Sequence, residues 1–168
     1  SNYVAFSHFH GEAVNNIGFI FIFLIAVFFS PVSVRANDSI LSSQKEYLEN
    51  GDYFEITTIK HDSNDFFSTS KTITASRTAK YVTSSGTVCW SVTVTGTFTY
   101  NGSTSKCTAS KVSASSNNSN WKIASKSSNR SGSTASATAT AKLYKGSTVI
   151  KTSTKTVKLS CSKNGTLS

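Results

Sequence analysis

Thr87–Tyr100 reads TVCWSVTVTGTFTY, and this stretch decides the fold. Apolar and polar residues alternate through it with a period of two. One face carries an almost unbroken apolar row, with Gly96 inside it: Val88, Trp90, Val92, Val94, Phe98 and Tyr100. The other face carries threonine and serine, together with Cys89. This alternation is typical of a half-buried antiparallel strand.

The residues that follow predict the partner of this strand. Asn101-Gly102 favours the positive φ angles of a tight hairpin turn, so the chain is expected to return as a strand over Ser103–Ala114. A two-residue turn would place Cys107 opposite Gly96. Cys107 would then lie on the buried face, next to a glycine that leaves it room.

Similar alternation recurs on both sides of this hairpin. It predicts further strands at Ile73–Val82, around Trp121 and Ile123, at Ala135–Leu143 and at Val157–Cys161. Glycine, asparagine and serine clusters between them predict turns at Ser84–Gly86, Asn117–Asn120 and Lys145–Ser147. Six or seven strands within about 100 residues indicate an all-β domain over residues 70–168, an immunoglobulin-like antiparallel β-sandwich.

Residues 1–36 are expected to form a signal peptide with an apolar helix. Ile17–Phe29 is a 13-residue apolar run, and Val34-Arg35-Ala36 supplies the small or apolar residues that signal peptidase requires before a cut at Asn37. A retained membrane anchor is the alternative, but a span needs about 20 apolar residues. The expected location is therefore extracellular, either free or held non-covalently at the cell surface.

Residues 37–69 form an acidic segment, with seven acids and two lysines. Asn50-Gly51 predicts a hairpin, Ser39–Leu48 a short helix, and His61–Ser70 a polar linker. The acids allow two interpretations. The segment is either a solvated linker, or an acidic element that lies on the basic domain.

Charge then excludes most catalytic chemistry. The chain has a net charge of +9, and no Asp or Glu follows Asp65; Phe66–Ser168 holds 14 basic residues and no histidine. Glycosidases require two carboxylates, catalytic triads require a histidine, and metal sites require clusters of His, Cys or acidic residues. The sequence therefore predicts a protein that is not an enzyme and that needs no cofactor or metal.

Three cysteines in an exported chain leave one unpaired. Strand parity places Cys107 and Cys161 on inward faces, so we expect a disulfide between them, closing a loop of about 55 residues. Cys89 falls on the polar face of its strand. It is either covered by a second sheet, a free thiol, or the site of an intermolecular bridge.

The basic residues point to an anionic partner. Five lysines on the last two strands are expected to face outward and to bind a polyanion: Lys142, Lys145, Lys151, Lys155 and Lys158. A broad positive field of this kind attracts anionic wall polymers such as teichoic acids, or other extracellular polyanions, without a specific pocket. The competing interpretation is that the charge only maintains solubility.

Nucleic-acid binding and protein binding are the two alternative functions. Nucleic-acid binding is disfavoured, because the basic region holds 12 lysines and two arginines, and only Tyr81 and Tyr144 are candidates for exposed stacking platforms. A secreted effector or inhibitor would act through polar loops at Asn117–Asn120 and Ser127–Ser133. The threonine row at Thr93–Thr99 is interpreted as a hydrated β face rather than an ice-binding one.

Several motifs resemble those of an uncharacterised family of small secreted proteins from Gram-positive, often gut-associated, bacteria. The resemblance covers about residues 45–168 and rests on Trp90–Ser103, Lys106-Cys107-Thr108, Trp121-Lys122-Ile123 and Leu159–Ser168. It implies a signal peptide and a β domain, and Cys107 and Cys161 match its pattern. Cys89 departs from it, because an aliphatic residue is expected there. The resemblance implies no activity.

Overall fold

The computed structural model describes residues 38–61 and 70–168, which form eight strands. In chain order these are β1 (Ser39–Tyr47), β2 (Tyr53–His61), β3 (Lys71–Val82), β4 (Val88–Tyr100), β5 (Ser105–Ser116), β6 (Trp121–Ser131), β7 (Thr134–Lys145) and β8 (Thr148–Ser160). No helix in these ranges is long and apolar enough to cross a membrane. The predicted signal peptide, and residues 62–69 of the predicted linker, lie outside the described residues.

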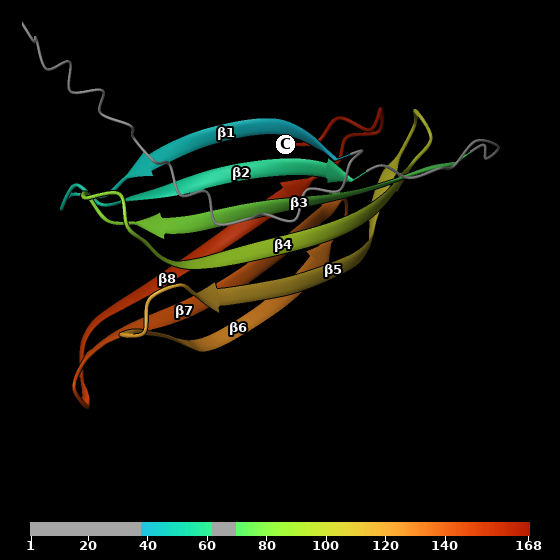
Figure 1. Cartoon of the computed structure of the whole chain (residues 1–168). Coiled ribbons are helices and arrows are strands. Elements are labelled where there is room, and N and C mark those ends of the chain that lie inside the picture. The colour runs from blue at the N-terminus through green and yellow to red at the C-terminus, as the bar shows by residue number, and fades with distance from the viewer. Residues whose placement is uncertain (1–37, 62–69) are drawn as a thin grey trace, which may run out of the picture. The chain divides into compact units, whose positions relative to one another are not determined.

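The strands form two antiparallel sheets, as Figure 1 shows, with orders β1-β2-β3-β4-β5 and β6-β7-β8. The predicted all-β class and antiparallel pairing are therefore confirmed. Within each sheet, every strand is hydrogen-bonded to the next strand along the chain. Neither sheet of the described region contains a crossover connection.

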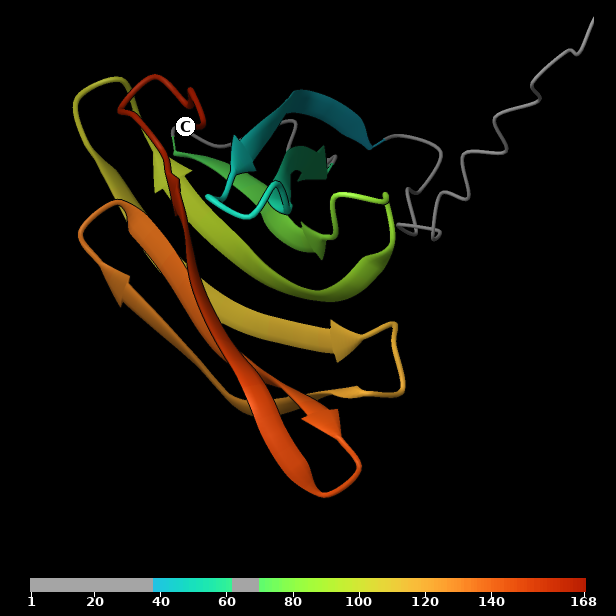
Figure 2. The same cartoon turned by 90° about the vertical axis from the view of Figure 1, so that its left-hand side faces the viewer.

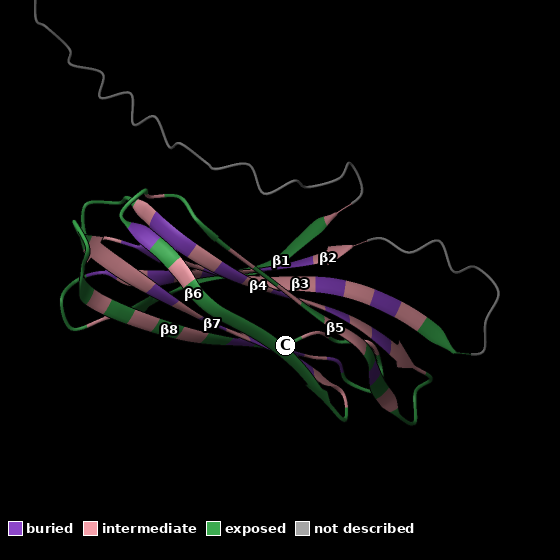
Figure 3. Cartoon of the chain, turned by 90° about the horizontal axis from the view of Figure 1, so that it is seen from below, coloured by how far each residue is buried: buried purple, intermediate pink, exposed green. Residues whose placement is uncertain are grey.

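The core lies between β4 and β7, where the predicted alternation holds. The inward residues Trp90, Val92, Val94 and Phe98 of β4 are completely buried. Across from them β7 contributes a row of buried alanines: Ala135, Ala137, Ala139 and Ala141. Alternating buried and intermediate residues along β3 and β4 are visible in Figure 3, whereas β1 is exposed throughout. Because the alanines are small, the two sheets can approach closely.

The β4–β5 turn differs from the prediction. It contains four residues rather than two, and the side-chain oxygen of Asn101 accepts hydrogen bonds from the backbone N–H groups of Ser103 and Thr104. Asn101 thereby stabilises a longer turn than Asn-Gly alone suggests. Cys107 consequently pairs with Phe98, not with Gly96. The predicted register is wrong, although Cys107 is buried as expected.

A bulge at the start of β4 changes the position of Cys89. Tyr81 pairs with Trp90 and Val82 pairs with Val88, so Cys89 has no residue opposite it in β3. The extra residue interrupts the period of two, and both Cys89 and Trp90 are buried. The placement of Cys89 on a polar face is therefore wrong.

The acidic segment is part of the larger sheet. Asn50-Gly51 lies in the connection between β1 and β2, Gly51 has a φ of 82°, and the predicted hairpin is confirmed. The predicted helix at Ser39–Leu48 is wrong, because Ser39–Tyr47 is β1 and pairs with β2. Since β2 in turn pairs with β3, the acidic hairpin lies next to the basic region. This arrangement agrees with the interpretation of the segment as an acidic element that lies on the basic domain.

The two sheets meet where the chain passes from β5 to β6 (Figure 2). Side chains rather than a backbone ladder join the two strands. Ser128 Oγ donates to the Ser110 carbonyl at 3.3 Å, and Arg130 Nη1 donates to the Thr108 carbonyl. This part of β6 was predicted to be a loop over Ser127–Ser133. That prediction is wrong, because the strand continues to Ser131.

Candidate anion-binding surface

The five predicted lysines lie on two different faces of the smaller sheet. Lys158 pairs with Ser136, and Lys142 lies between the buried Ala141 and the inward Leu143, so both lysines are on the outer face. Lys145 is exposed at the end of β7. Lys151 and Lys155 pair with Leu143 and Ala139 on the inner face.

The expectation that Lys151 and Lys155 face outward is therefore wrong. Both have the same parity as Val157 and Leu159, which are buried. A β-strand alternates its faces, so all four residues lie on one side of β8. The two lysines occupy the part of this inner face that lies opposite the acidic hairpin rather than opposite the apolar core.

Lys151 joins a buried polar cluster at the start of β2. Its Nζ lies 3.3 Å from Asp52 Oδ2 and also donates to the Tyr81 hydroxyl. The Tyr81 hydroxyl donates to Asp52, and the Ser84 backbone N–H donates to Asp52 Oδ1 at 3.0 Å. Tyr81 is 1% exposed. The cluster thus connects the hairpin, β3 and β8, and the expectation that Tyr81 is an exposed stacking platform is wrong.

These contacts shift the ionisation of all three side chains. The Tyr81 hydroxyl, with help from Ser84, Asn50 and Lys151, outweighs burial and lowers the pKa of Asp52 to about 2. Burial raises the pKa of Tyr81. Burial opposes the charge on Lys151, but hydrogen bonds to Tyr81 and Asp52 raise its pKa overall. At neutral pH the cluster therefore holds an ionised Asp52 and a protonated Lys151.

Lys155 forms a second connection to the hairpin. Its Nζ lies 2.6 Å from Glu46 Oε2 and 4.7 Å from the centre of the Phe54 ring. The Lys155 side chain is 14% exposed and that of Glu46 is 53% exposed. Two of the five lysines that were predicted to bind a polyanion, Lys151 and Lys155, are therefore neutralised by the chain's own acids.

The outer face of the smaller sheet keeps its positive charge. All described acids lie between Asp38 and Glu55, and none of them forms an ion pair with Lys122, Lys142 or Lys158 within residues 38–61 and 70–168. Lys122 and Lys142 are direct cross-strand partners. Like charges placed opposite each other in this way repel and destabilise a sheet unless an anion lies between them.

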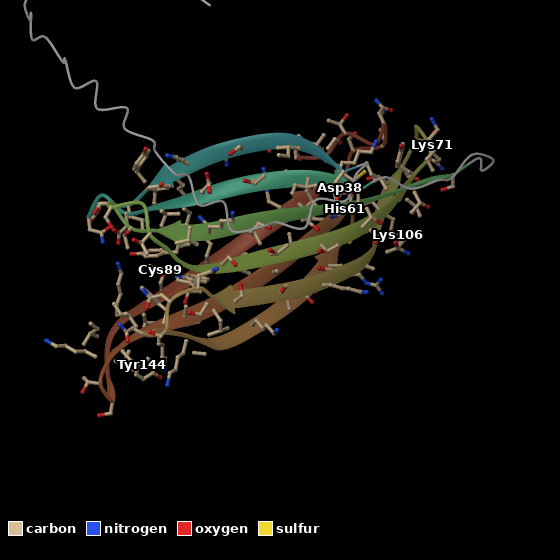
Figure 4. The ribbon with its side chains drawn as sticks, in the orientation of Figure 1. Asp38, His61, Lys71, Cys89, Lys106 and Tyr144 are labelled. Carbon is tan, nitrogen blue, oxygen red and sulfur yellow. The ribbon has the colours of Figure 1, made fainter. Side chains whose placement is uncertain are left out.

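Two neighbouring features complete this outer face. The ring of Tyr144, labelled in Figure 4, lies 5.1 Å from Lys122 Nζ. Paired hydroxyls extend from there along β7 and β8, at Thr140–Thr154, Thr138–Thr156 and Thr134–Ser160, each pair 2.8 Å apart. These groups can donate to and accept from a polar polymer laid across the sheet.

A narrow groove separates the edge strand β1 from the edge strand β8. It has a volume of about 270 Å³ and is lined by Gln44, Glu46, Ile56, Arg77, Lys155, Thr156, Val157 and Lys158. Arg77 Nη1 donates to the Lys158 carbonyl at 2.9 Å. Arg77 was not among the residues predicted to bind a ligand. Its parity was the available signal, because it occupies an inward position between Ala75 and Ala79, where an apolar residue is expected.

A wider depression, of about 560 Å³, lies between the β4–β5 turn and the β6–β7 turn. It is lined by residues 104–108 and 130–132, which include Lys106 and Arg130 but no acid. Figure 4 shows Lys106 and Lys71 near this end of the molecule. The depression adds to the positive surface, although Arg130 is already bonded to the Thr108 carbonyl.

The cysteines do not form the predicted pair. Cys89, Cys107 and Cys161 are all described, and all three are buried free thiols. The Cys107–Cys161 disulfide is therefore absent. Backbone N–H groups hold the two residues on either side of the β6–β7 turn, with Cys107 donating to Gly132 and Cys161 to Ser133. Burial raises the pKa of each thiol, which disfavours the reactive thiolate.

No family model matches this chain, and neither a curated protein nor a solved structure is significantly similar to it.

Proposed function

We propose that this protein is a secreted, non-catalytic β protein that binds anionic polymers of the cell envelope or the extracellular space. The outer face of β6–β8 is the binding surface, with Lys122, Lys142 and Lys158 as its cations. The architecture that we propose is an immunoglobulin-like β-sandwich, in which two antiparallel sheets enclose one core. Secretion rests on the apolar run and cleavage pattern before Asn37.

The distribution of acids is the observation that carries this proposal. The described ranges contain 16 basic residues and five acids, and the acids are confined to the hairpin and the residue before it. The hairpin neutralises Lys151 and Lys155 but not the outer lysines. A polyanion lying over the opposed Lys122–Lys142 pair would relieve their repulsion.

Charge that serves only solubility predicts a different outcome. In that case the position of each lysine is unimportant, and any two neutralising substitutions have the same effect on binding. The proposed surface requires that Lys122 and Lys142 matter more than lysines elsewhere. The protein-binding alternative loses part of its basis, because Ser127–Ser131 belongs to a strand rather than to a loop.

The test is retention of the full chain on immobilised teichoic acid and on heparin along a sodium chloride gradient. We expect the double variant Lys122→Gln/Lys142→Gln to elute at distinctly lower salt than the wild type. Screening by salt should release both proteins, because exposed charges interact over only about 10 Å at 0.1 M salt.

The matched control is Lys45→Gln/Lys60→Gln, which removes the same charge from the hairpin. It should elute close to the wild type. Equal loss in the two double variants would support a general charge effect and reject the surface. A wild-type protein that is not retained at low salt on either polymer would reject the proposed function.

A further inference from the structure

The groove between β1 and β8 contains a cation whose hydrogen bonds are incomplete. Arg77 Nε is buried and has no hydrogen-bond partner among the described residues. No acid within residues 38–61 and 70–168 pairs with Arg77. A buried donor without an acceptor is costly, so its presence requires an explanation, and a bound ion or ligand that supplies the acceptor is one.

The one bond that Arg77 makes fixes its orientation. Nη1 donates to the Lys158 carbonyl, on the edge strand β8. This leaves the edge of the guanidinium that carries Nε and Nη2. Two parallel N–H groups on that edge match two oxygens of one carboxylate or one phosphate.

Thr58 does not itself line the groove, but it is the register partner of Arg77 and has a second incomplete group. Thr58 and Arg77 are register partners in β2 and β3, so their side chains lie on the same inner face. Thr58 is 2% exposed, and its hydroxyl has no hydrogen-bond partner in the described part of the chain. A hydroxyl can donate to the same anion that Arg77 holds.

The residues at the rim of the groove carry both a positive charge, which attracts an anion, and a negative charge, which competes with it. Lys155 adds a positive charge, and Glu46 adds a negative charge that is bound to Lys155. The apolar Ile56 and Val157 provide further lining. A volume of about 270 Å³ is sufficient for a small anionic group but not for a folded partner.

We infer that this groove is a discrete binding site for a single carboxylate or phosphate group, held by the free edge of Arg77 and by the Thr58 hydroxyl. The groove adjoins the outer lysine surface, because Lys158 also lines it. Its oxyanion is held by Arg77 and Thr58 and not by the outer lysines. The groove recognises one oxyanion through directed hydrogen bonds, whereas the outer surface acts through its positive field.

The experiment follows the Arg77 Nε–H signal in NMR spectra of the full chain. Sodium acetate and sodium phosphate are titrated separately, against sodium chloride at the same ionic strength. We expect a saturable shift with at least one oxyanion and none with chloride. The acetate and phosphate arms decide which group the site prefers. A signal that follows ionic strength alone would overturn the inference.

Four variants give independent readouts. Arg77→Lys keeps the charge but loses the paired donors, and should weaken oxyanion binding by about tenfold or more. Thr58→Val should weaken binding without loss of thermal stability, because it removes a hydroxyl that has no partner. Glu46→Gln should strengthen binding by removing the competing charge. Lys111→Ala, at an exposed position on β5 away from the groove, should leave binding unchanged.

Unchanged binding in folded Arg77→Lys would reject the site. If Arg77→Lys does not fold, Thr58→Val and Glu46→Gln decide, and failure of both to change affinity rejects it. The polymer assay is scored separately. If the wild-type protein is retained on the polymers but binds neither acetate nor phosphate, only this inference is rejected. If it binds an oxyanion but is not retained on the polymers, only the proposed function is rejected.

Discussion

Gly96 determines how closely the two sheets approach at the centre of the core. A Cβ atom at this position would lie 2.6 Å from the Phe98 ring and 2.9 Å from the Cβ of Ala135 on the opposite sheet. Neither neighbour can move freely, since both are completely buried. The glycine is therefore required for the packing of β4 against β7, not for an unusual backbone angle.

We predict that Gly96→Ala lowers the free energy of unfolding by about 1–3 kcal/mol, as overpacking of a dense core usually does. Urea unfolding followed by tryptophan fluorescence measures this change. Ser113→Ala, at an exposed position on β5, is the control and should change stability by less than about 0.5 kcal/mol. Equal stability of Gly96→Ala and the wild type would show that the sheets can separate at this point.

Asp52 makes the fold sensitive to acid. Its pKa in the folded protein is about 2, below the ordinary value of 3.8, so the ionised carboxylate stabilises the fold. This stabilisation is complete above about pH 4 and is lost as the pH falls from about 4 to about 2. Since Asp52 contacts Tyr81 and Lys151, its protonation weakens the attachment of the hairpin to β3 and β8.

We predict that Asp52→Asn lowers the unfolding free energy at pH 7 by about 1–3 kcal/mol, and that it flattens the dependence of the melting temperature on pH between 4 and 2. Thermal melts across this range provide the measurement. Glu49→Gln removes the same charge from an exposed position and should keep the wild-type profile. An unchanged slope in Asp52→Asn would assign the acid sensitivity to other carboxylates.

At the scale of elements, the β1–β2 hairpin is attached to β8 by two ionic contacts of unequal strength, beside its backbone pairing with β3. Asp52 is buried among several donors, whereas the Glu46 side chain is 53% exposed and, within residues 38–61 and 70–168, forms an ion pair only with Lys155. Exposed ion pairs contribute little, because water and salt screen them and two long side chains lose freedom.

Glu46→Gln is accordingly predicted to change stability by less than about 1 kcal/mol at neutral pH. A thermal melt of this variant beside Asp52→Asn makes the comparison within one element. If Glu46→Gln is as destabilising as Asp52→Asn, the Lys155 contact holds the hairpin more strongly than its exposure suggests.

The strands themselves could be predicted from the sequence, but several of their relations could not. The period of two identified β4 and its inward face, because a single sheet face buries alternate residues. The Cys89 bulge and the four-residue turn at Asn101 shift the register by local hydrogen bonding, which hydrophobic alternation does not encode. The turn moved Cys107 from Gly96 to Phe98, and the bulge moved Cys89 off the predicted polar face.

The candidate site was predicted only in part, for a reason of the same kind. Lys142 and Lys158 lie on the outer face as expected, but the inward position of Lys151 and Lys155 depends on which strands carry acids opposite them. Absence of acids after Asp65 is a property of the sequence. In three dimensions, the β1–β2 hairpin brings Asp52 to Tyr81 and Lys151. The folded domain therefore includes acids, although residues 66–168 contain none.

At the scale of the whole molecule, one core connects the two sheets. Cys89, Cys107 and Cys161 all belong to a single cluster of buried residues. Cys89 lies near the start of β4, while Cys107 pairs with Phe98 near its other end. The thiols therefore report on separate regions of the same core.

We predict that all three thiols react with iodoacetamide together, over the denaturant range in which the protein unfolds, and that native protein reacts far more slowly. Mass spectrometry of labelled peptides identifies each site. Earlier labelling of Cys89 would reveal a separately unfolding end. If the unfolded protein is lighter by two hydrogens and Cys107 and Cys161 stay unlabelled, the two residues form a disulfide after all.

The sequential order of the strands also bears on how the chain folds during synthesis. Within each sheet, each strand can pair with the one made just before it, so short loops close first and little entropy is lost at each step. β8 pairs with β7 and also makes long-range contacts, because Lys151 and Lys155 meet Asp52 and Glu46 from the first hairpin. The last strand made thus supplies the cations for acids placed about 100 residues earlier. A nascent chain without β8 already has all five strands of the larger sheet, but its Asp52 lacks Lys151 as a counter-ion until β8 is made.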